Sequence, residues 1–124
     1  MKKVGNNAGF TLVEIMVVVT VIGLMAAMML PGMMKARKRS QAISILSEAR
    51  QMDAAIDEWI LEKRQKEGSV VLTSEAATYL KGTWRNTDLF GNSYVIGLVG
   101  TTNITIAPET KKALDGAGID WGRF

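Results

Sequence analysis

The stretch from Gly9 to Pro31, GFTLVEIMVVVTVIGLMAAMMLP, decides the fold of this chain. Between Phe10 and Leu30 it carries a single charged side chain, Glu14. As an α-helix it is roughly 31 Å long, which is enough to cross the hydrocarbon core of a bilayer. An acidic side chain at the centre of such a helix costs about 2.5–3.5 kcal/mol on insertion scales. Glu14 lies near one end, so its cost is lower, but it still needs a partner.

Residues 1–9, MKKVGNNAG, precede the apolar run and carry Lys2 and Lys3. A secretory signal peptide has its small-residue cleavage site after its apolar region. Here the small pair Ala8-Gly9 comes before that region. A cut at this point would make the apolar segment the new N-terminus.

Gly9, Phe10, Glu14 and Pro31, at these spacings, resemble the N-terminal signature of type IV pilins and of their relatives, the type II secretion pseudopilins. The resemblance implies that a membrane-embedded prepilin peptidase cuts between Gly9 and Phe10 on the cytoplasmic side. The same enzyme would then N-methylate Phe10. The alternative is an ordinary signal anchor that happens to contain a glutamate.

The charge of Glu14 suits such processing. Cleavage would create an ammonium group on Phe10 at the positive dipole end of the helix, and Glu14, one turn further on, gains from the same dipole. The resemblance implies that in a filament Glu14 lies beside the ammonium group of a neighbouring subunit. Such a pair would neutralise two charges that are each costly in an apolar interior. We therefore expect Glu14 to set the axial register between subunits.

Composition narrows the possible functions. The chain has no Cys and no His, which excludes thiol nucleophiles, disulfides and imidazole bases. No phosphate loop and no nucleophile with a nearby base is recognisable, so the sequence indicates a protein that is not an enzyme. The formal net charge is +3, but removal of Lys2 and Lys3 leaves 13 basic and 12 acidic side chains. This charge does not favour a nucleic-acid partner.

Gly23 and Pro31 are the weak points of the apolar helix. Proline removes a helix hydrogen bond and glycine is a poor helix former. The resemblance implies that the helix between such points melts when subunits leave the membrane and pack into a filament. The alternatives are a fixed kink and a helix end at the membrane surface.

A basic cluster follows the span directly and consists of Lys35, Arg37, Lys38 and Arg39. Counting Lys and Arg near the span would place the following domain in the cytoplasm. The resemblance implies the opposite orientation, and we adopt it because a cleavage signature is more specific than a small difference in charge. The cluster could bind lipid phosphates, acidic residues of neighbouring subunits or nucleic acid.

From about residue 35 to residue 67 the pattern is that of an amphipathic helix, with Gly68 as the expected C-cap. Trp59 lies beside the apolar stripe and is expected in the core. The stripe needs cover, which residues 68–124 must supply. The residues of the apolar stripe are Ile43, Leu46, Ala49, Met52, Ile56 and Ile60.

The rest of the chain predicts a small domain. The segments 94–99 and 103–106 indicate a β-hairpin whose apolar face covers the long helix. Pro108 opens a short helix that runs to about Leu114. The tail residues expected to pack against this domain are Ile119, Trp121 and Phe124.

The stretch DLFGNSY, residues 88–94, resembles the Asp-Pro-aromatic-Gly-Asn-Pro-Tyr turn of major pseudopilins. Leu89 and Ser93 stand where that family has prolines. The resemblance favours a pseudopilin-like subunit over an adhesive pilin. The matching residues are Asp88, Gly91, Asn92 and Tyr94, with Phe90 as the aromatic residue.

Major pseudopilins often hold calcium in this half of the chain, and the resemblance raises the same question here. Oxygen ligands could come from Asp88, Asp115 and Asp120. Because the sequence has no dense acidic cluster there, we expect solvated carboxylates and no cofactor.

Together these patterns predict an α+β protein with a leader at 1–9, a transmembrane and assembly helix at 10–31, its amphipathic continuation at 32–67 and a small head at 68–124 that packs on 40–67.

The resemblance implies a structural subunit of a type IV pilus-like filament or a type II secretion pseudopilus. It would sit in the bacterial inner membrane with its N-terminus in the cytoplasm and its head on the periplasmic side, and then in a filament. Its partners would be the prepilin peptidase, identical subunits, membrane lipid and an inner-membrane assembly platform. Two alternatives are a minor pilin that binds DNA or a surface at a fibre tip, and a single-span protein that never assembles.

Overall fold

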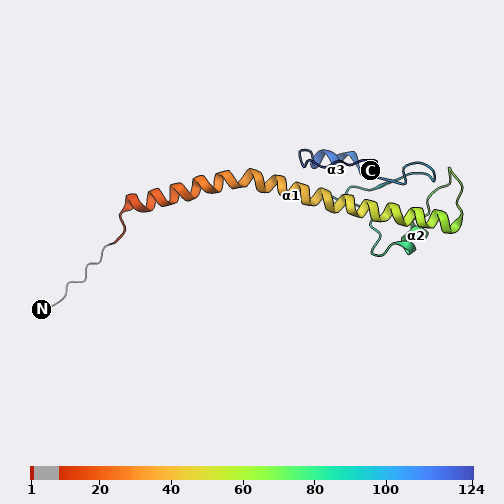
Figure 1. Ribbon diagram of the computed structural model, residues 1–124, viewed down its shortest axis with the longest axis horizontal. Helices are drawn as coiled ribbons and strands as arrows, with labels where there is room; N and C mark the ends of the chain where they lie inside the picture. The colour runs from red at the N-terminus through yellow and green to blue at the C-terminus, as the bar shows by residue number, and fades with distance from the viewer. Residues whose placement is uncertain (2–8) are drawn as a thin grey trace. The chain divides into compact units, whose positions relative to one another are not determined.

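The computed structural model describes Met1 and residues 9–124. These form two compact units, Met1–Met34 and Lys35–Phe124. The helix α1, Leu12–Lys63, contributes residues to both of them (Figure 1). Most of the expected leader, residues 2–8, lies outside the described residues.

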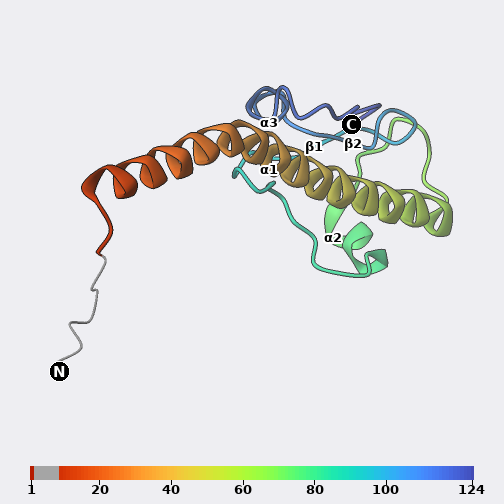
Figure 2. The same cartoon turned by 60° about the vertical axis from the view of Figure 1, so that its left-hand side comes forward.

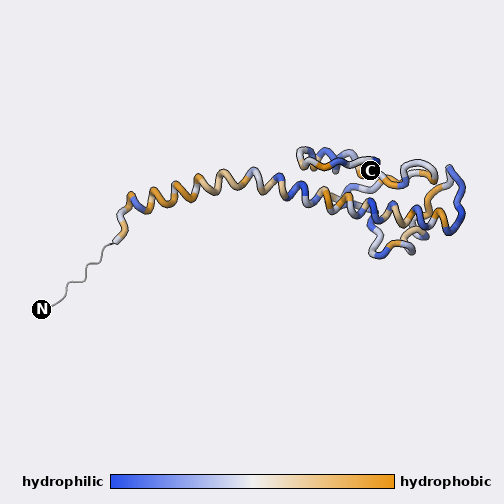
Figure 3. Tube along the Cα trace, in the orientation of Figure 1, coloured by the Kyte–Doolittle hydropathy of each residue, from blue (hydrophilic) through white to orange (hydrophobic). Residues whose placement is uncertain are grey.

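The N-terminal part of α1 has the length and composition of a membrane span. Within the described residues, α1 is the one helix long and apolar enough to cross a bilayer. None of its apolar window is buried within the protein. Figure 3 shows this part as mainly hydrophobic, whereas the part of α1 in the second unit alternates between polar and apolar residues. The exposed apolar side chains require cover by lipid or by other protein.

Gly23 and Pro31 both lie inside α1. The alternative in which the helix ends near Pro31 is therefore wrong for this structure. Pro31 lacks the N–H that would bond one turn back, but the helix continues on both sides of it. Melting of this region during assembly stays a prediction.

The C-terminal end of α1 is closed by Arg64. This residue adopts a left-handed backbone conformation with φ of 50°. The Gln65 N–H donates to the Ile60 carbonyl at 3.0 Å and the Arg64 N–H to the Leu61 carbonyl at 3.4 Å. This is the Schellman pattern, which is most often built on a glycine.

The expectation that Gly68 caps the helix is thus wrong, and α1 ends at Lys63 rather than near Glu67. The Gly68 N–H instead donates to the Val99 carbonyl at 2.8 Å, which fastens the following segment to the hairpin. An arginine in the capping position gives no signal that a sequence pattern could detect.

The core of the second unit forms along one face of α1. Trp59 is fully buried, as predicted. Ile43 is 51% exposed, so its assignment to the buried stripe is wrong. Ala42 is buried in its place, and adjacent helix residues point about 100° apart. The buried residues of this face are Ala42, Ile45, Leu46, Ala49, Met52, Ala55, Ile56 and Trp59.

Short elements complete this unit. In both ribbon views α2 and α3 lie on different sides of α1 (Figures 1 and 2). The elements are α2, Thr73–Ala76; the 3₁₀-helix η1, Ala77–Tyr79; β1, Val95–Ile96; β2, Ile104–Thr105; and α3, Pro108–Ala113.

The predicted hairpin is confirmed, although its strands are short. β1 and β2 pair antiparallel, with Val95 opposite Thr105 and Ile96 opposite Ile104. Ile104 and Ile106 are fully buried and join the core that covers α1. The α+β architecture predicted from the sequence is therefore present.

The C-terminal segment also packs as predicted. α3 begins at Pro108, whose fixed φ suits the first turn of a helix. Phe124 is buried in the core, and Ile119 and Trp121 pack partly buried against it.

Candidate assembly site

The first turn of α1 is held by reciprocal hydrogen bonds between Thr11 and Glu14. The Glu14 N–H donates to Thr11 Oγ1 at 3.2 Å, and the Thr11 N–H donates to Glu14 Oε2 at 2.9 Å. This is a capping box, which satisfies two N–H groups that a helix start would leave unpaired. Thr11 was missed among the candidate residues, although its Thr-x-x-Glu spacing is a recognised signal.

The predicted processing residues lie next to this turn. Gly9 and Phe10 precede α1 and are exposed, with Phe10 at 84%. The peptide bond between them is therefore accessible. Within the described residues, Glu14 Oε1 accepts no hydrogen bond, so the carboxylate can receive a neighbouring ammonium group without giving up its cap. Cleavage, methylation and charge pairing here stay predictions.

The basic cluster lies at the start of the second unit, within α1. Its side chains are exposed except for that of Lys38, which is half-buried. Lys38 Nζ donates to the Asp115 carbonyl at 3.4 Å. No ion pair involves these cations in the part of the chain that the structure describes, so the cluster presents mainly exposed positive charge.

The pseudopilin-like turn folds around Asp88. Its Oδ1 accepts the N–H groups of Phe90 at 2.8 Å and Asn92 at 3.0 Å. Gly91 adopts φ of 82° to complete the reversal. Asp88 Oδ2 accepts the hydroxyl of Thr110 on α3, and Asn92 Nδ2 donates to Thr110 Oγ1 at 2.8 Å. The turn therefore fastens α3 to the head.

Thr110→Val should destabilise the head by about 2–3 kcal/mol, because it leaves polar atoms of Asp88 and Asn92 without a partner in a buried place. Thr110 is itself fully buried, so water has little access. Thr110→Ser is the matched control and should cost about 1 kcal/mol for the lost methyl group. Denaturant unfolding of the full chain in detergent measures both. A valine variant as stable as the serine variant would contradict the role of the hydroxyl.

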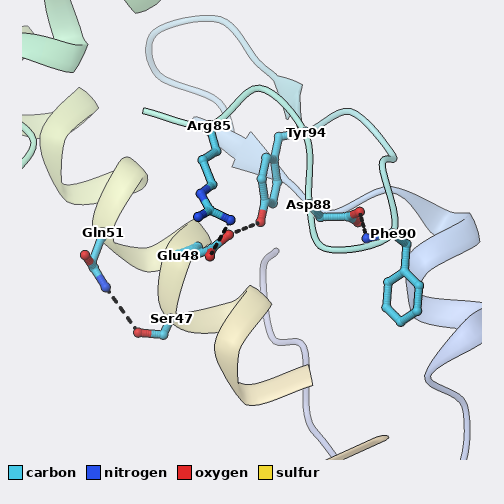
Figure 4. Close-up of polar contacts among 7 residues, drawn as sticks. All are labelled: Ser47, Glu48, Gln51, Arg85, Asp88, Phe90 and Tyr94. Atoms are coloured by element: carbon cyan, nitrogen blue, oxygen red, sulfur yellow. Dashed lines mark hydrogen bonds and ion pairs between the residues drawn. The ribbon is translucent and has the colours of Figure 1, made fainter. Parts of the chain in front are cut away.

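Tyr94, the last matching residue of the turn, joins this loop to α1. Its hydroxyl donates to Glu48 Oε2 at 3.2 Å, and Arg85 pairs with Glu48 Oε1 at 3.7 Å (Figure 4). Burial, followed by the negative charge of Glu48, raises the pKa of Tyr94 well above its usual value. Tyr94 therefore remains a protonated donor at physiological pH.

The three aspartates considered as calcium ligands do not converge. Both carboxylate oxygens of Asp88 are already occupied by protein donors. Asp115 Oδ1 accepts the Gly116 N–H and Asp120 Oδ1 accepts the Gly122 N–H, each at 2.9 Å. In the part of the chain that the structure describes, no group of three or more acidic, His or Cys side chains could hold a metal.

A buried acidic contact was not predicted from the sequence. Asp53 on α1 is 4% exposed. Its Oδ1 accepts Asn103 Nδ2 at 3.1 Å, and its Oδ2 accepts the guanidinium of Arg123. Asn103 Nδ2 also lies 2.6 Å from Asp57 Oδ1. These contacts join α1 to the hairpin and to the C-terminal tail.

The stability contributed by Asp53 should depend on pH. Burial raises the pKa of Asp53 above 3.8, while the Asn103 hydrogen bond and the Arg123 charge oppose the rise. Because the folded state then binds the proton more readily than the unfolded chain, this group stabilises the fold less as pH rises through its folded pKa. We expect the stability of the wild type relative to Asp53→Asn to increase from neutral pH down to about pH 4. Unfolding across a pH series tests this, and a relative stability that falls over the same range would contradict it.

These features define a class of protein: a single apolar span that begins with an accessible Gly-Phe bond and a capped glutamate, followed by a small α+β head. Residues 5–30 match the family model described as the prokaryotic N-terminal methylation motif. Fimbrial protein Q of Moraxella bovis is 27% identical, over 93% of this chain and 78% of that protein. The type II secretion system core protein G of Vibrio cholerae is 25% identical, over 100% of this chain and 96% of that protein.

A third relative is similar mainly in the N-terminal half. The type IV major fimbrial protein FimA of Dichelobacter nodosus is 40% identical over 46% of this chain and only 36% of that protein. No solved structure matches the chain. The chain is thus similar to type IV fimbrial proteins and to a type II secretion core protein, and its N-terminal segment matches the methylation-motif family.

Proposed function

We propose that this protein is a structural filament subunit that a prepilin peptidase cuts between Gly9 and Phe10 and that polymerises through α1. The observation that carries the proposal is the exposed Gly9–Phe10 bond directly before the turn in which Glu14 caps an apolar span. The relatives support it, because they are named as fimbrial proteins and as a core protein of type II secretion.

During assembly the apolar part of α1 moves from one apolar environment to another. In the membrane, lipid covers the apolar part of α1, and in the filament the same surface packs against sibling helices. The ammonium group of Phe10 in one subunit then reaches the free Oε1 of Glu14 in another. The two charges neutralise each other at the position where either alone would be costly.

The proposed orientation places the N-terminus in the cytoplasm, where the peptidase acts, and the head on the periplasmic side. An inner-membrane platform supplied by other chains extracts the processed subunits. Counting Lys and Arg residues near the span would favour the opposite orientation, because the basic cluster follows the span. We give the cleavage signature more weight than this count, because the signature is more specific than a small difference in charge.

We assign the subunit to a secretion pseudopilus in preference to an adhesive pilus. The similarity to core protein G extends over 96% of that protein, and the Asp88 turn supports the same assignment. The similarity to fimbrial protein Q, over 78% of its length, makes a type IV pilus the competing assignment.

The test is to express the full chain with a prepilin peptidase and with either a secretion or a pilus assembly machinery. Negative-stain microscopy of sheared surface fibres should reveal filaments only when the peptidase is present. Filaments with the secretion machinery alone would support the pseudopilus assignment. A processed chain that forms no filament with either machinery would contradict the proposed function.

A further inference from the structure

One face of α1 in the second unit is not covered by the rest of the head. It begins at Arg37 and ends at Glu58, and every residue that defines it is exposed. Their three- and four-residue spacing places them on one side of the helix. Between the two charged ends lie Ser40, Ser44, Ser47, Gln51 and Ala54. We call this surface the open face.

The open face forms the floor of a groove. Ser40, Ser44 and Ser47 line it on α1, and the segment 80–85 forms its other wall, with a volume of about 610 Å³. Gln51 Nε2 donates to Ser47 Oγ at 3.2 Å, so even the longest side chain of the floor lies along the helix (Figure 4). A second hollow continues the groove past Ala54 to Glu58. Glu48 and Arg85 line the side of the groove and pair with each other at 3.7 Å, whereas the open-face residues of its floor between Arg37 and Glu58 are uncharged.

The charge of the open face differs between its two ends. Lys35 and Arg39 surround Arg37 with further exposed positive charge, and Glu62 follows Glu58 by one turn. Among the described residues neither Arg37 nor Glu58 takes part in an ion pair. Lys81 lines the hollow beside Glu58, and no ion pair between the two is present among the residues that the structure describes.

An open face with a positive end and a negative end is complementary to the same face of a second copy of this chain. We propose that α1 of a second copy of this chain lies on the open face, parallel to the first and displaced along it so that Arg37 of one copy meets Glu58 of the other. The copies are parallel because every copy crosses the membrane in the same direction. The proposal rests on the proposed function, since it concerns how the subunits of the filament register.

The displacement follows from the helix geometry. Arg37 and Glu58 are separated by 21 positions, which corresponds to about 32 Å along a helix. A contact between unlike ends of two copies does not close on itself, so it repeats from subunit to subunit and builds a fibre. Opposite charges at a rim contribute more to the choice of register than to affinity.

An anionic lipid surface is the competing partner for the basic end. It does not account for the rest of the face, because the serine-lined floor carries no charge and Glu58 would be repelled by lipid phosphates. A second copy of the chain and a lipid surface predict different results when the charges of Arg37 and Glu58 are exchanged.

The first test exchanges the charges in the full chain and measures the yield of sheared filaments. Arg37→Glu and Glu58→Arg should each lower the yield about tenfold or more, because each places like charges opposite one another. The double variant should restore most of it. Lys112→Glu, which makes the same charge change on α3, should leave the yield unchanged. Immunoblots of cleaved and uncleaved chain confirm that each variant is made and processed.

A double variant no better than the single variants would overturn the pairing, and so would a normal yield from Arg37→Glu. In both cases wild-type filaments would still be present, so the proposed function would stand. Absence of wild-type filaments would remove the proposed function and the register together.

The second test uses the absence of natural cysteines. Ser40→Cys with Leu61→Cys places two thiols at the same 21-position displacement, and oxidation of intact filaments should give a ladder of cross-linked chains. Ser40→Cys with Ser47→Cys is the matched control on the same face, with the wrong displacement. Equal or stronger cross-linking of the control would overturn the proposed register.

Discussion

Glu14→Ala should lower filament yield by at least about a hundredfold while cleavage between Gly9 and Phe10 continues. In the filament the ammonium group of Phe10 would lose its counter-charge in an apolar interior. Breaking a buried ion pair by removing one partner costs about 3–5 kcal/mol, and each 1.4 kcal/mol corresponds to about tenfold in an equilibrium constant. Sheared-fibre yield and intact mass of the membrane fraction measure the two effects separately.

Glu14→Gln is the control that separates charge from capping. Its amide oxygen can still accept the Thr11 N–H that Glu14 Oε2 accepts at 2.9 Å, so the first turn keeps its cap but loses its charge. If charge pairing drives assembly, the glutamine variant should be nearly as defective as the alanine variant. Normal filaments from Glu14→Ala would contradict the role of this side chain altogether. Normal filaments from Glu14→Gln alone would assign its role to the capping box.

Gly97→Ala should destabilise the head by about 3 kcal/mol, at the upper end of what overpacking costs. A Cβ atom at this position would overlap the Thr102 carbonyl oxygen and lie 2.8 Å from Thr101 Oγ1. The nearer contact is with backbone, so the hairpin itself would have to move. That movement would strain the hydrogen bond of the Gly97 N–H to the Asn103 carbonyl, now 3.0 Å, and the contact of Asn103 with Asp53.

Leu98→Ala is the matched control, because Leu98 is the next residue and its side chain is 45% exposed. It should cost less than about 1 kcal/mol. Urea unfolding of the purified full chain in detergent, followed by tryptophan fluorescence, compares the two variants. Equal losses would show that the close approach at Gly97 is not a constraint on the fold.

The features that the sequence predicted correctly are those with a local pattern. The apolar run from Phe10 to Leu30 predicted a long apolar helix, which is present as the N-terminal part of α1 and is long enough to cross a bilayer. Alternating residues predicted the hairpin, and Pro108 predicted the start of α3. Each of these signals lies within a few neighbouring residues, so no knowledge of the tertiary structure was needed.

Thr11 was missed although its Thr-x-x-Glu signal is local. The other features that were missed depend on contacts between distant segments. Asp53 has the pattern of a surface residue, and only its partners Asn103 and Arg123 make it part of the core. Thr110 is likewise defined by Asp88, which lies in another element. Distance in the sequence conceals both contacts.

Errors at the boundaries of α1 have a different cause. Arg64 adopts the left-handed conformation that glycine usually adopts at a helix C-terminus. The C-cap was therefore wrongly predicted at Gly68, the first glycine after the helix. Ile43 follows the three- and four-residue spacing but is 51% exposed and lines the groove, whereas Leu46, Ala49, Met52 and Ile56 are buried as predicted. A periodic pattern predicts the buried stripe better than it predicts where the stripe ends along the helix.

Processing at Gly9–Phe10 is tested most directly by the intact mass and N-terminal sequence of the protein purified from membranes that contain its own assembly machinery. We expect a chain that begins at Phe10 and carries one added methyl group on its amino terminus. A chain that still begins at Met1 would contradict processing by a prepilin peptidase. The apolar segment would then be a simple anchor, and the cations that follow it would place the head in the cytoplasm.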